Sequence, residues 1–422
     1  MNLIKDLYKN SKYYLFGTAP GLFELLHNLP VISFFINNVL RSIGQVIFCN
    51  NPITGFFILI AALIDTNSQE QILYSLASII CSNLLVLLIS KKEINIAQNG
   101  LHGFNSMLVG MALPIFLYHK IGGWTPDFRM IGAIILLPIF TVILGLILNK
   151  YFKKLDCVPF TLPFNIVLFI FLLEAERKSS IYFVNTQLIK PTMLEIGYIV
   201  DTNTTKFEPE HFVEGIMNGI SQVFLIMNPI SGFIILVGML FYSRISTLAA
   251  ILGSFIGLSY GTIIGSLNSN IKAGLWGYNS MLSCVAIGGI FTIPNFYTFI
   301  YSILCSIITS MLFGCFQTLF QPWGLPCATI PFCIGSIIFM SLRNLNIKGL
   351  YFVDFDNITS PEDHIKLHND YIEISDTHNV SHKILDLDEV ELNTINQINE
   401  ATENNENIQN NEINENNINN IL

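Results

Sequence analysis

The stretch Asn-Gly-Leu-His-Gly-Phe-Asn-Ser-Met-Leu-Val-Gly at 99–110 has a close copy, Ala-Gly-Leu-Trp-Gly-Tyr-Asn-Ser-Met-Leu, at 273–282. Seven of the ten aligned positions are identical, each at an offset of 174, and an eighth pairs two aromatic residues, Phe104 and Tyr278. A polar, glycine-containing block that returns inside apolar sequence indicates that two parts of the chain adopt the same local structure.

Two further pairs of segments recur in the same order. The segment 45–56 returns at 222–233, with Gln, Val, Asn, Pro, Ile, Gly and Phe at equivalent positions and an offset of 177. Thr-Leu-Pro-Phe at 161–164 returns as Thr-Ile-Pro-Phe at 329–332, at an offset of 168. Three paired blocks in one order indicate an internal duplication of the chain.

The composition is that of a membrane protein. Hydrophobic residues make up 52% of the chain and charged residues only 12%, about half the share of an ordinary soluble domain. From Ala273 to Leu342 there is no Asp, Glu, Lys or Arg, and these 70 residues are long enough for about three membrane-spanning helices.

The apolar segments predict an all-α polytopic fold with five spans in each half and re-entrant segments beside them. Five is an odd number, so the two copies enter the bilayer in opposite directions, as an inverted repeat. We expect five regions. An amphipathic amino-terminal segment (1–33) precedes the first repeat (34–175), and an extracellular loop (176–210) joins that repeat to the second one (211–346). A cytosolic, acidic, Asn-rich, disordered tail (347–422) follows.

Lysine and arginine placement favours cytosolic amino and carboxyl termini. The net charge of −9 comes from the tail, because 351–422 holds 16 of the 30 acidic residues and only two lysines. The other 350 residues carry 19 basic and 14 acidic residues, a charge of +5. The eight cysteines form no Cys-x-x-Cys pair and are expected to be buried thiols.

The doubled block and the segment Leu-Pro-Cys-Ala-Thr-Ile-Pro-Phe at 325–332 resemble the motifs of the urea transporter family. This resemblance runs from about 34 to 345 and implies a channel-type transporter that moves urea down its gradient through a pore in each protomer. It also implies a homotrimer in the plasma membrane, in contact with lipid, with no cofactor, no bound metal and no nucleic-acid partner. We therefore do not expect an enzyme.

Urea is planar and neutral, with four N–H donors and one carbonyl oxygen, so its path has to offer hydrogen-bond acceptors and flat apolar walls. Gln45 and Gln222 stand at equivalent positions before the two Asn-Pro breaks, and an amide side chain offers both a donor and an acceptor. Both are candidate urea-binding residues, and the alternative is that each caps backbone groups freed at its own helix break.

Thr161 and Thr329 stand two residues before a Pro-Phe and resemble the threonines that the family places near the middle of its pore. A hydroxyl there can accept from a urea N–H, although a threonine can also bond the carbonyl one turn earlier in its helix. The first half departs from the family pattern, because Cys157-Val158 stand where Leu-Pro is expected and Pro159 follows one place later.

Phe48 resembles an aromatic wall of a urea-sized slot, and its counterpart in the second half is Leu225, so the two slots would be unequal. Leu101 and Leu275, from the doubled block, are candidate facing walls. The glycines and asparagines of that block are expected to serve close packing.

Three alternatives remain. A channel of this kind could pass other small neutral amides, ammonia or water. An ion-coupled secondary transporter would need acidic or histidine groups inside the membrane, and none occurs in 273–342. An intramembrane enzyme would need a nucleophile, metal or carboxylate constellation, and the spans contain no such pattern.

Overall fold

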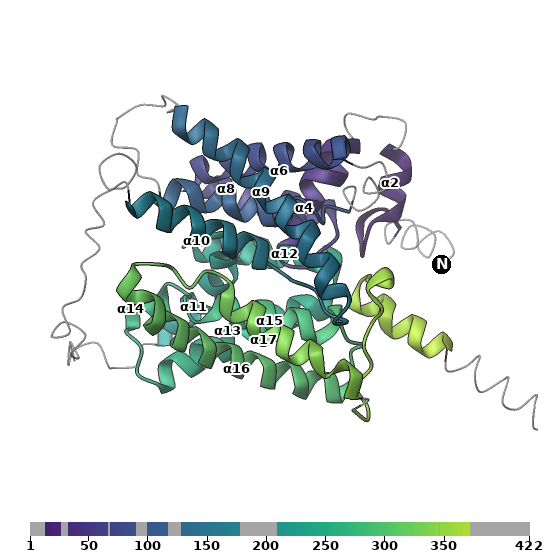
Figure 1. Ribbon diagram of the computed structural model, residues 1–422. Coiled ribbons are helices and arrows are strands. Elements are labelled where there is room, and N and C mark those ends of the chain that lie inside the picture. Colours follow the sequence, from purple (N-terminus) through teal and green to yellow (C-terminus); the bar gives the residue numbers. More distant parts are fainter. Residues whose placement is uncertain are drawn as a thin grey trace, which may run out of the picture. The chain divides into compact units, whose positions relative to one another are not determined.

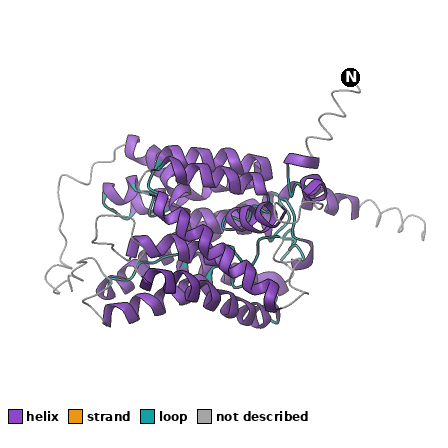
Figure 2. Cartoon of the chain, turned by 90° about the horizontal axis from the view of Figure 1, so that it is seen from above, coloured by secondary structure: helices purple, strands orange, loops and turns teal. Residues whose placement is uncertain are grey.

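The computed structural model describes residues 13–26, 33–65, 68–89, 99–116, 128–177, 209–345 and 347–371. These residues form helices and connecting loops and contain no strand, which confirms the all-α expectation for this part of the chain (Figure 2). The chain divides into two compact units, Met1–His364 and Ile365–Leu422, and the helices named below lie in the first.

The first half of the apolar region follows a short helix α2 (Pro20–Leu26) and contains six α-helices and one π-helical segment among the described residues. They are η1 (Phe34–Leu40), α4 (Arg41–Gln45), α5 (Pro52–Ile64), α6 (Gln69–Ile89), α8 (Phe104–Phe116), α9 (Phe128–Lys153) and α10 (Leu162–Arg177).

The second half repeats this order of elements, with short helical segments between the longer ones (Figure 1). They are α11 (Pro209–Ser221), η3 (Gln222–Phe224), α12 (Pro229–Tyr242), α13 (Arg244–Ile263), α14 (Asn268–Lys272), α15 (Gly277–Val285), η4 (Ala286–Ile290), α16 (Phe296–Phe320), η5 (Gln321–Trp323), α17 (Ile330–Ser341), η6 (Leu342–Leu345) and η7 (Phe355–Asn357).

Four helices in the described residues are long and apolar enough to cross a membrane, at 69–89, 132–153, 244–263 and 296–323. A fifth candidate is the pair 209–224 and 229–242, which is bent by 72° at its break. Four further apolar helices are shorter, at 52–64, 104–115, 162–174 and 330–345. The described residues thus contain fewer long apolar helices than the ten expected spans, and the Asn-Pro breaks account for part of this difference because they interrupt helices.

Each Asn-Pro break starts a new helix with the same cap. Asn51 is extended, and its side-chain oxygen accepts from the N–H groups of Ile53 and Thr54 at 2.7 and 3.4 Å. Asn228 caps α12 in the same way, at 2.9 and 3.4 Å. Because the capping oxygen pairs N–H groups of the first turn that have no carbonyl partner within the helix, and proline itself has no N–H to satisfy, the break is stable inside an apolar region.

Unusual backbone conformations also occur in pairs that match the sequence offsets. Phe48 and Leu225, which are 177 positions apart, have φ of 63° and 56°. Gly100 and Gly274 have φ of 76° and 74°. A Cβ on either glycine would collide with the backbone of the helix before its Asn-Pro break, so both sites require glycine. The doubled sequence blocks thus fold into matching local structures.

The two halves contact each other through reciprocal bonds between α5 and α12. The Thr54 hydroxyl donates to the Gly238 carbonyl at 2.8 Å, and the equivalent Ser231 hydroxyl donates to the Ala61 carbonyl at 2.6 Å. All four positions are related by the offset of 177. Contacts in which each element bonds the other through the same positions are those of a two-fold arrangement.

Residues 347–364 form a strap that packs on the second half. The N–H of Ile293 donates to the Tyr351 carbonyl at 2.8 Å, and the N–H of Val353 donates to the Phe291 carbonyl at 3.0 Å. Arg343 forms an ion pair with Asp354 at 2.7 Å. The expectation of a disordered tail from 347 is therefore wrong for these residues, because apolar side chains and backbone bonds among the acidic residues hold them in place. Residues 372–422 lie outside the described part.

His364 fixes the end of the strap. Its Nε2 accepts from the Thr359 N–H at 2.9 Å, and its Nδ1 lies 3.0 Å from the Gly289 carbonyl. Since a carbonyl only accepts, Nδ1 carries the proton and the ring is neutral. Burial lowers the pKa of His364 below the usual 6.5, although the charged groups that face it, Glu362 and Asp363, act in the opposite direction.

Docking of the strap should weaken as the pH falls. The free imidazole takes up a proton below about pH 6.5 while the docked ring resists it, so the docked state loses stability in that range. Between about pH 7.5 and about pH 5.5, the protection factors against amide hydrogen exchange at 351–364, which already account for the intrinsic pH dependence of exchange, should fall by up to about 10-fold. His364→Asn cannot titrate and should abolish this pH dependence; an equal fall in the variant would assign the effect to another group.

Candidate functional site

Two threonines from the two halves meet in the interior. The hydroxyl oxygens of Thr161 and Thr329 lie 2.6 Å apart, although the residues are separated by 168 positions. Their exposed fractions are 3% and 4%. The structure thus brings together the two threonines that the sequence selects separately. The alternative was that each hydroxyl bonds the carbonyl one turn earlier in its own helix, but here the two hydroxyls bond each other.

The local backbone explains where the threonines lie. Thr161 directly precedes α10, and Thr329 is the amino-terminal cap residue of α17, with a proline in the first turn of each helix. The residue before each threonine has positive φ, 50° at Phe160 and 43° at Ala328. Because both helices begin here, the positive ends of two helix dipoles lie at the threonine pair.

The doubled-block asparagines hold these two turns in place. Asn105 donates to the Phe160 carbonyl and accepts from the Phe164 N–H, both at 3.3 Å. Asn279 makes the equivalent pair of bonds to Ala328 and Phe332, both at 3.1 Å. The expected packing role of these two asparagines is thus a specific one, since each fixes the turn that carries a threonine.

Two more side chains complete the centre, and sequence reasoning missed both. The Asn165 amide donates to the Thr161 carbonyl at 2.7 Å and to the Thr329 hydroxyl at 2.9 Å, while its oxygen accepts from the Thr329 N–H at 3.0 Å. Cys333 Sγ lies 3.1 Å from the Thr161 hydroxyl. Asn165 and Cys333 directly follow the two Thr-x-Pro-Phe motifs and are themselves related by the offset of 168. This position in the repeat is the sequence signal that could have identified them.

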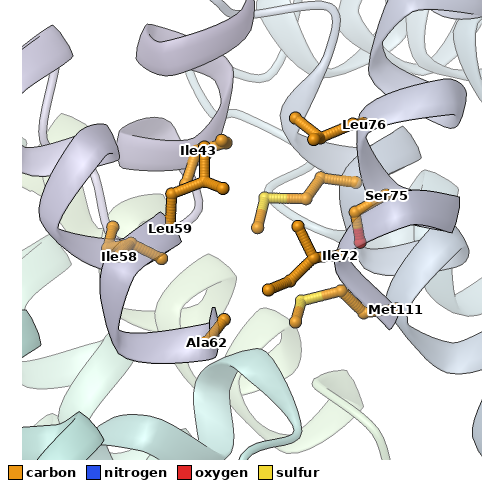
Figure 3. A pocket seen from close by; sticks show the side chains of 9 residues that line it. Ile43, Ile58, Leu59, Ala62, Ile72, Ser75, Leu76 and Met111 are labelled. Atoms are coloured by element: carbon orange, nitrogen blue, oxygen red, sulfur yellow. The ribbon is translucent and has the colours of Figure 1, made fainter. Parts of the chain in front are cut away.

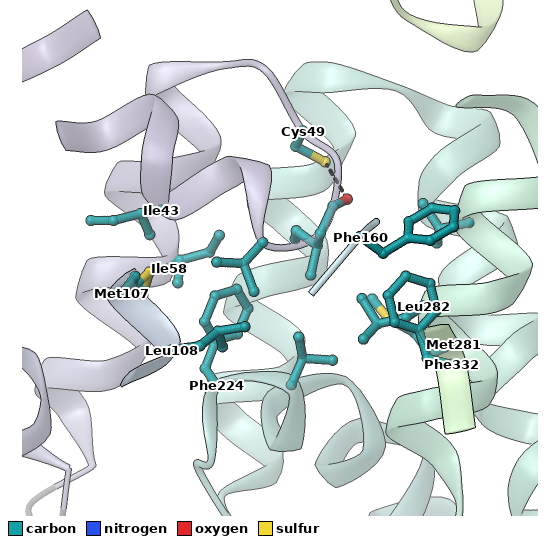
Figure 4. Close-up of a cluster of buried hydrophobic side chains, with 14 of the residues drawn as sticks. Ile43, Cys49, Ile58, Met107, Leu108, Phe160, Phe224, Met281, Leu282 and Phe332 are labelled. Atoms are coloured by element: carbon teal, nitrogen blue, oxygen red, sulfur yellow. Dashed lines mark hydrogen bonds between the residues drawn. The ribbon is translucent and has the colours of Figure 1, made fainter. Parts of the chain in front are cut away.

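An aromatic cluster surrounds Phe48. Its ring makes edge contacts with Phe160, Phe291 and Phe332, with centroid distances of 6.1, 5.8 and 5.9 Å. Figure 4 shows Phe160 and Phe332 close to Met281 and Leu282 of the second half. The counterpart Leu225 shares the backbone conformation of Phe48 without its ring. The signal for the other rings was weak, because the chain contains 33 phenylalanines.

The two glutamines lie at the ends of their broken helices. Gln45 ends α4, is half-buried, and donates from Nε2 to the Asn99 carbonyl at 3.0 Å. Gln222 begins η3 and is also half-buried. The Gln45 amide therefore connects its break to the start of the doubled block.

The two leucines of the doubled block have different surroundings. Leu101 is 45% exposed, whereas Leu275 is half-buried and packs in a cluster that includes Trp276 and Phe313. The Trp276 indole donates to the Ser266 hydroxyl at 2.7 Å. Leu101 and Leu275 therefore have different surroundings, because the large Trp276 lies next to Leu275 where His102 lies next to Leu101.

A small pocket in the first half has a different chemistry. It lies between α4, α5, α6 and α8, and Figure 3 shows its largely aliphatic walls. Its one polar side chain is that of Ser75, whose hydroxyl donates to the Gln71 carbonyl at 2.6 Å. A pocket without free acceptors cannot replace the water around four urea N–H groups, so we do not assign it to the solute.

The threonine pair is a neutral, acceptor-rich centre. The two threonines bond each other, the Asn165 amide and the Cys333 thiol through their hydroxyl and backbone groups. Among the described residues no cluster of three or more His, Cys, Asp or Glu side chains is arranged to hold a metal ion.

Comparison with known proteins gives concordant matches. The family model described as "Urea transporter" matches residues 36–344. The chain is 30% identical over 350 residues to proteins named "Urea transporter 1" from Ovis aries and Capra hircus, which covers 83% of this chain and 88% of each relative. The protein of the same name from Rattus norvegicus is 28% identical over the same coverage.

Proposed function

Because the chain belongs to the urea transporter family, we propose that it is a passive channel through which urea moves down its gradient. The observation that carries this proposal is the contact between Thr161 and Thr329 at 2.6 Å, where the two halves meet in a neutral environment. Other small neutral amides are secondary candidate solutes, because they share the planar amide group.

Urea passes the threonine pair by exchanging hydrogen-bond partners. A urea N–H can take the place of one hydroxyl as the partner of the other, so each bond that is lost is replaced by a similar one. Such an exchange keeps the net cost small, in contrast to an apolar constriction, where each unpaired donor costs about 2 kcal/mol or more. The weak net binding also allows exit from the site.

Neutral side chains at the centre argue against coupling to an ion gradient. The titratable groups needed to bind sodium or a proton would be carboxylates or paired histidines. Asn165 and Cys333 occupy the places beside the threonines instead. We therefore propose uniport by a channel mechanism.

We propose that the two halves form an inverted repeat of five spans each. Support comes from the reciprocal α5–α12 bonds, the matched caps at Asn51 and Asn228, and the bent pair 209–224 and 229–242. Within this arrangement the first repeat covers 34–175 and the second 211–346, with the extracellular loop 176–210 between them. The broken and short helices would be the re-entrant pore segments.

We also propose the solute-contacting residues along the path. Thr161 and Thr329 form its middle, Gln45 and Gln222 offer amides near the two breaks, and Phe48 forms the flat wall on one side. We propose Leu101 and Leu275 as apolar walls that face these residues. The replacement of Phe48 by Leu225 in the second half makes the two slots unequal in width.

For the assembled protein we propose a homotrimer in the plasma membrane, with lipid around it, a pore in each protomer and cytosolic termini. In this orientation, the strap at 347–364 and the acidic tail beyond it face the cytosol. The mildly basic charge of the remaining chain suits contact with anionic headgroups on that side.

The proposal is tested with purified protein in proteoliposomes. In a stopped-flow experiment with an inward urea gradient, the vesicles should re-swell faster than protein-free vesicles, and the rate should scale with the amount of protein. Vesicles that contain correctly folded protein but re-swell at the protein-free rate would reject the proposed function.

A further inference from the structure

We propose that Asn165 is a positioning residue that fixes the direction of the hydrogen bonds at the threonine pair, so that the pore centre presents acceptors and no hydroxyl donor. The inference deepens the proposed function and rests on it. It starts from an asymmetry, because position 165 is an amide and its counterpart at 333 is a thiol.

The bonds around Asn165 account for both of its protons. One points to the Thr161 carbonyl at 2.7 Å and the other to the Thr329 hydroxyl oxygen at 2.9 Å, while the Cys333 sulfur, a weaker acceptor, lies farther from the same nitrogen, at 3.7 Å. Since the amide oxygen also accepts from the Thr329 N–H, the side chain is held from both ends. Asn165 is fully buried, so water cannot compete for these bonds.

The bond between the two hydroxyls can run in either direction. If Thr329 donates to Thr161, then Thr161 can donate to the Cys333 sulfur at 3.1 Å, and each hydroxyl oxygen keeps one free lone pair. If Thr161 donates to Thr329 instead, both lone pairs of Thr329 are occupied, by Thr161 and by the Asn165 amide. Its own proton then has no partner among these groups.

Asn165 favours the first direction for two reasons. An oxygen that accepts from an amide becomes a better hydroxyl donor, because bonds in a chain polarise one another. The second direction also leaves a buried hydroxyl proton unpaired, which has a free-energy cost. The favoured chain runs from Asn165 through Thr329 and Thr161 to Cys333, and both of its free lone pairs can accept from a solute N–H.

A centre with two acceptors and no free donor selects solutes by their number of N–H groups. Urea has four such groups, whereas acetamide has nearly the same planar shape but only two, since a methyl group replaces one amide nitrogen. The chain should therefore conduct urea in preference to acetamide, and this preference should depend on the amide at 165.

The experiment compares the urea-to-acetamide permeability ratio in proteoliposomes of the parent, Asn165→Cys, Cys333→Asn and the double swap. Asn165→Cys removes the amide donor and should lower the ratio by about 2- to 12-fold, the equivalent of one net hydrogen bond. Cys333→Asn gives both hydroxyls an amide donor. One hydroxyl can then donate to the other, but the second hydroxyl proton has no acceptor, so the centre gains a free donor and the ratio should fall as well. The swap moves the amide to 333, reverses the chain, and should restore the ratio to within about 2-fold of the parent.

Each result has a defined meaning. An unchanged urea-to-acetamide ratio in Asn165→Cys would overturn the inference. A lowered ratio that the correctly folded double swap does not restore would overturn it too, because Asn165 would then serve packing alone. If Asn165→Cys does not fold, the ratio in the swap decides in the same way. A parent that does not conduct urea would reject the proposed function, whereas a conducting parent with unchanged ratios in the variants would reject this inference alone.

Discussion

Thr329→Val is expected to lower urea flux by about 5- to 150-fold, if an unmet urea donor at this position costs about 1–3 kcal/mol and the position limits passage. Valine keeps the shape of threonine and removes the hydroxyl oxygen that lies 2.6 Å from Thr161. The same change leaves one proton of the Asn165 amide without its acceptor. Flux per folded protein in proteoliposomes, measured by stopped-flow light scattering, gives the result.

Thr161→Val is the matched control and should have the smaller effect. The Thr161 hydroxyl contacts the Thr329 hydroxyl and the sulfur of Cys333, so its loss leaves one hydroxyl and a weakly bonding thiol without a partner, whereas the Asn165 amide keeps both of its acceptors. If both variants are folded and conduct urea at the parent rate, the threonines serve packing and the proposed path is wrong at its middle.

Asn105→Leu is expected to destabilise the protein by about 2–6 kcal/mol, because it leaves two buried backbone groups unpaired at about 1–3 kcal/mol each. These are the Phe160 carbonyl and the Phe164 N–H. The loss of folded protein on heating, followed by size-exclusion chromatography in detergent, should show a clearly lower midpoint than the parent.

Asn279→Leu should cost about half as much, although its bonds are shorter. The Ala328 carbonyl keeps a second donor, the Tyr278 hydroxyl at 2.6 Å, so only the Phe332 N–H loses its partner. Removing both donors with Tyr278→Phe and Asn279→Leu should raise the cost to that of Asn105→Leu. Equal midpoints for the two leucine variants would show that these backbone groups find other partners.

The features of this protein that sequence reasoning could predict are those that occur twice. The offset of 168 identified both threonines, and the structure places their hydroxyls in contact. The Asn-Pro pairs predicted broken helices, and each asparagine caps one. A doubled motif is informative because two copies have to satisfy the same local backbone requirement.

The features that sequence reasoning missed are those that occur once. Asn165 and Cys333 differ from each other, so the repeat did not emphasise either, although both lie at the centre. The strap at 347–364 is acidic and follows the last repeat, and its packing depends on contacts such as that of His364 with Gly289. Contacts across 75 positions leave no periodic pattern in the sequence.

The central claim is that urea moves passively, and the most direct test is the steady-state urea concentration inside proteoliposomes under an imposed sodium or proton gradient. The account predicts that internal urea rises only to the external concentration, and that neither gradient changes this end point, because the groups that contact the threonine pair are neutral. Urea accumulation above the external concentration, driven by either gradient, would contradict it.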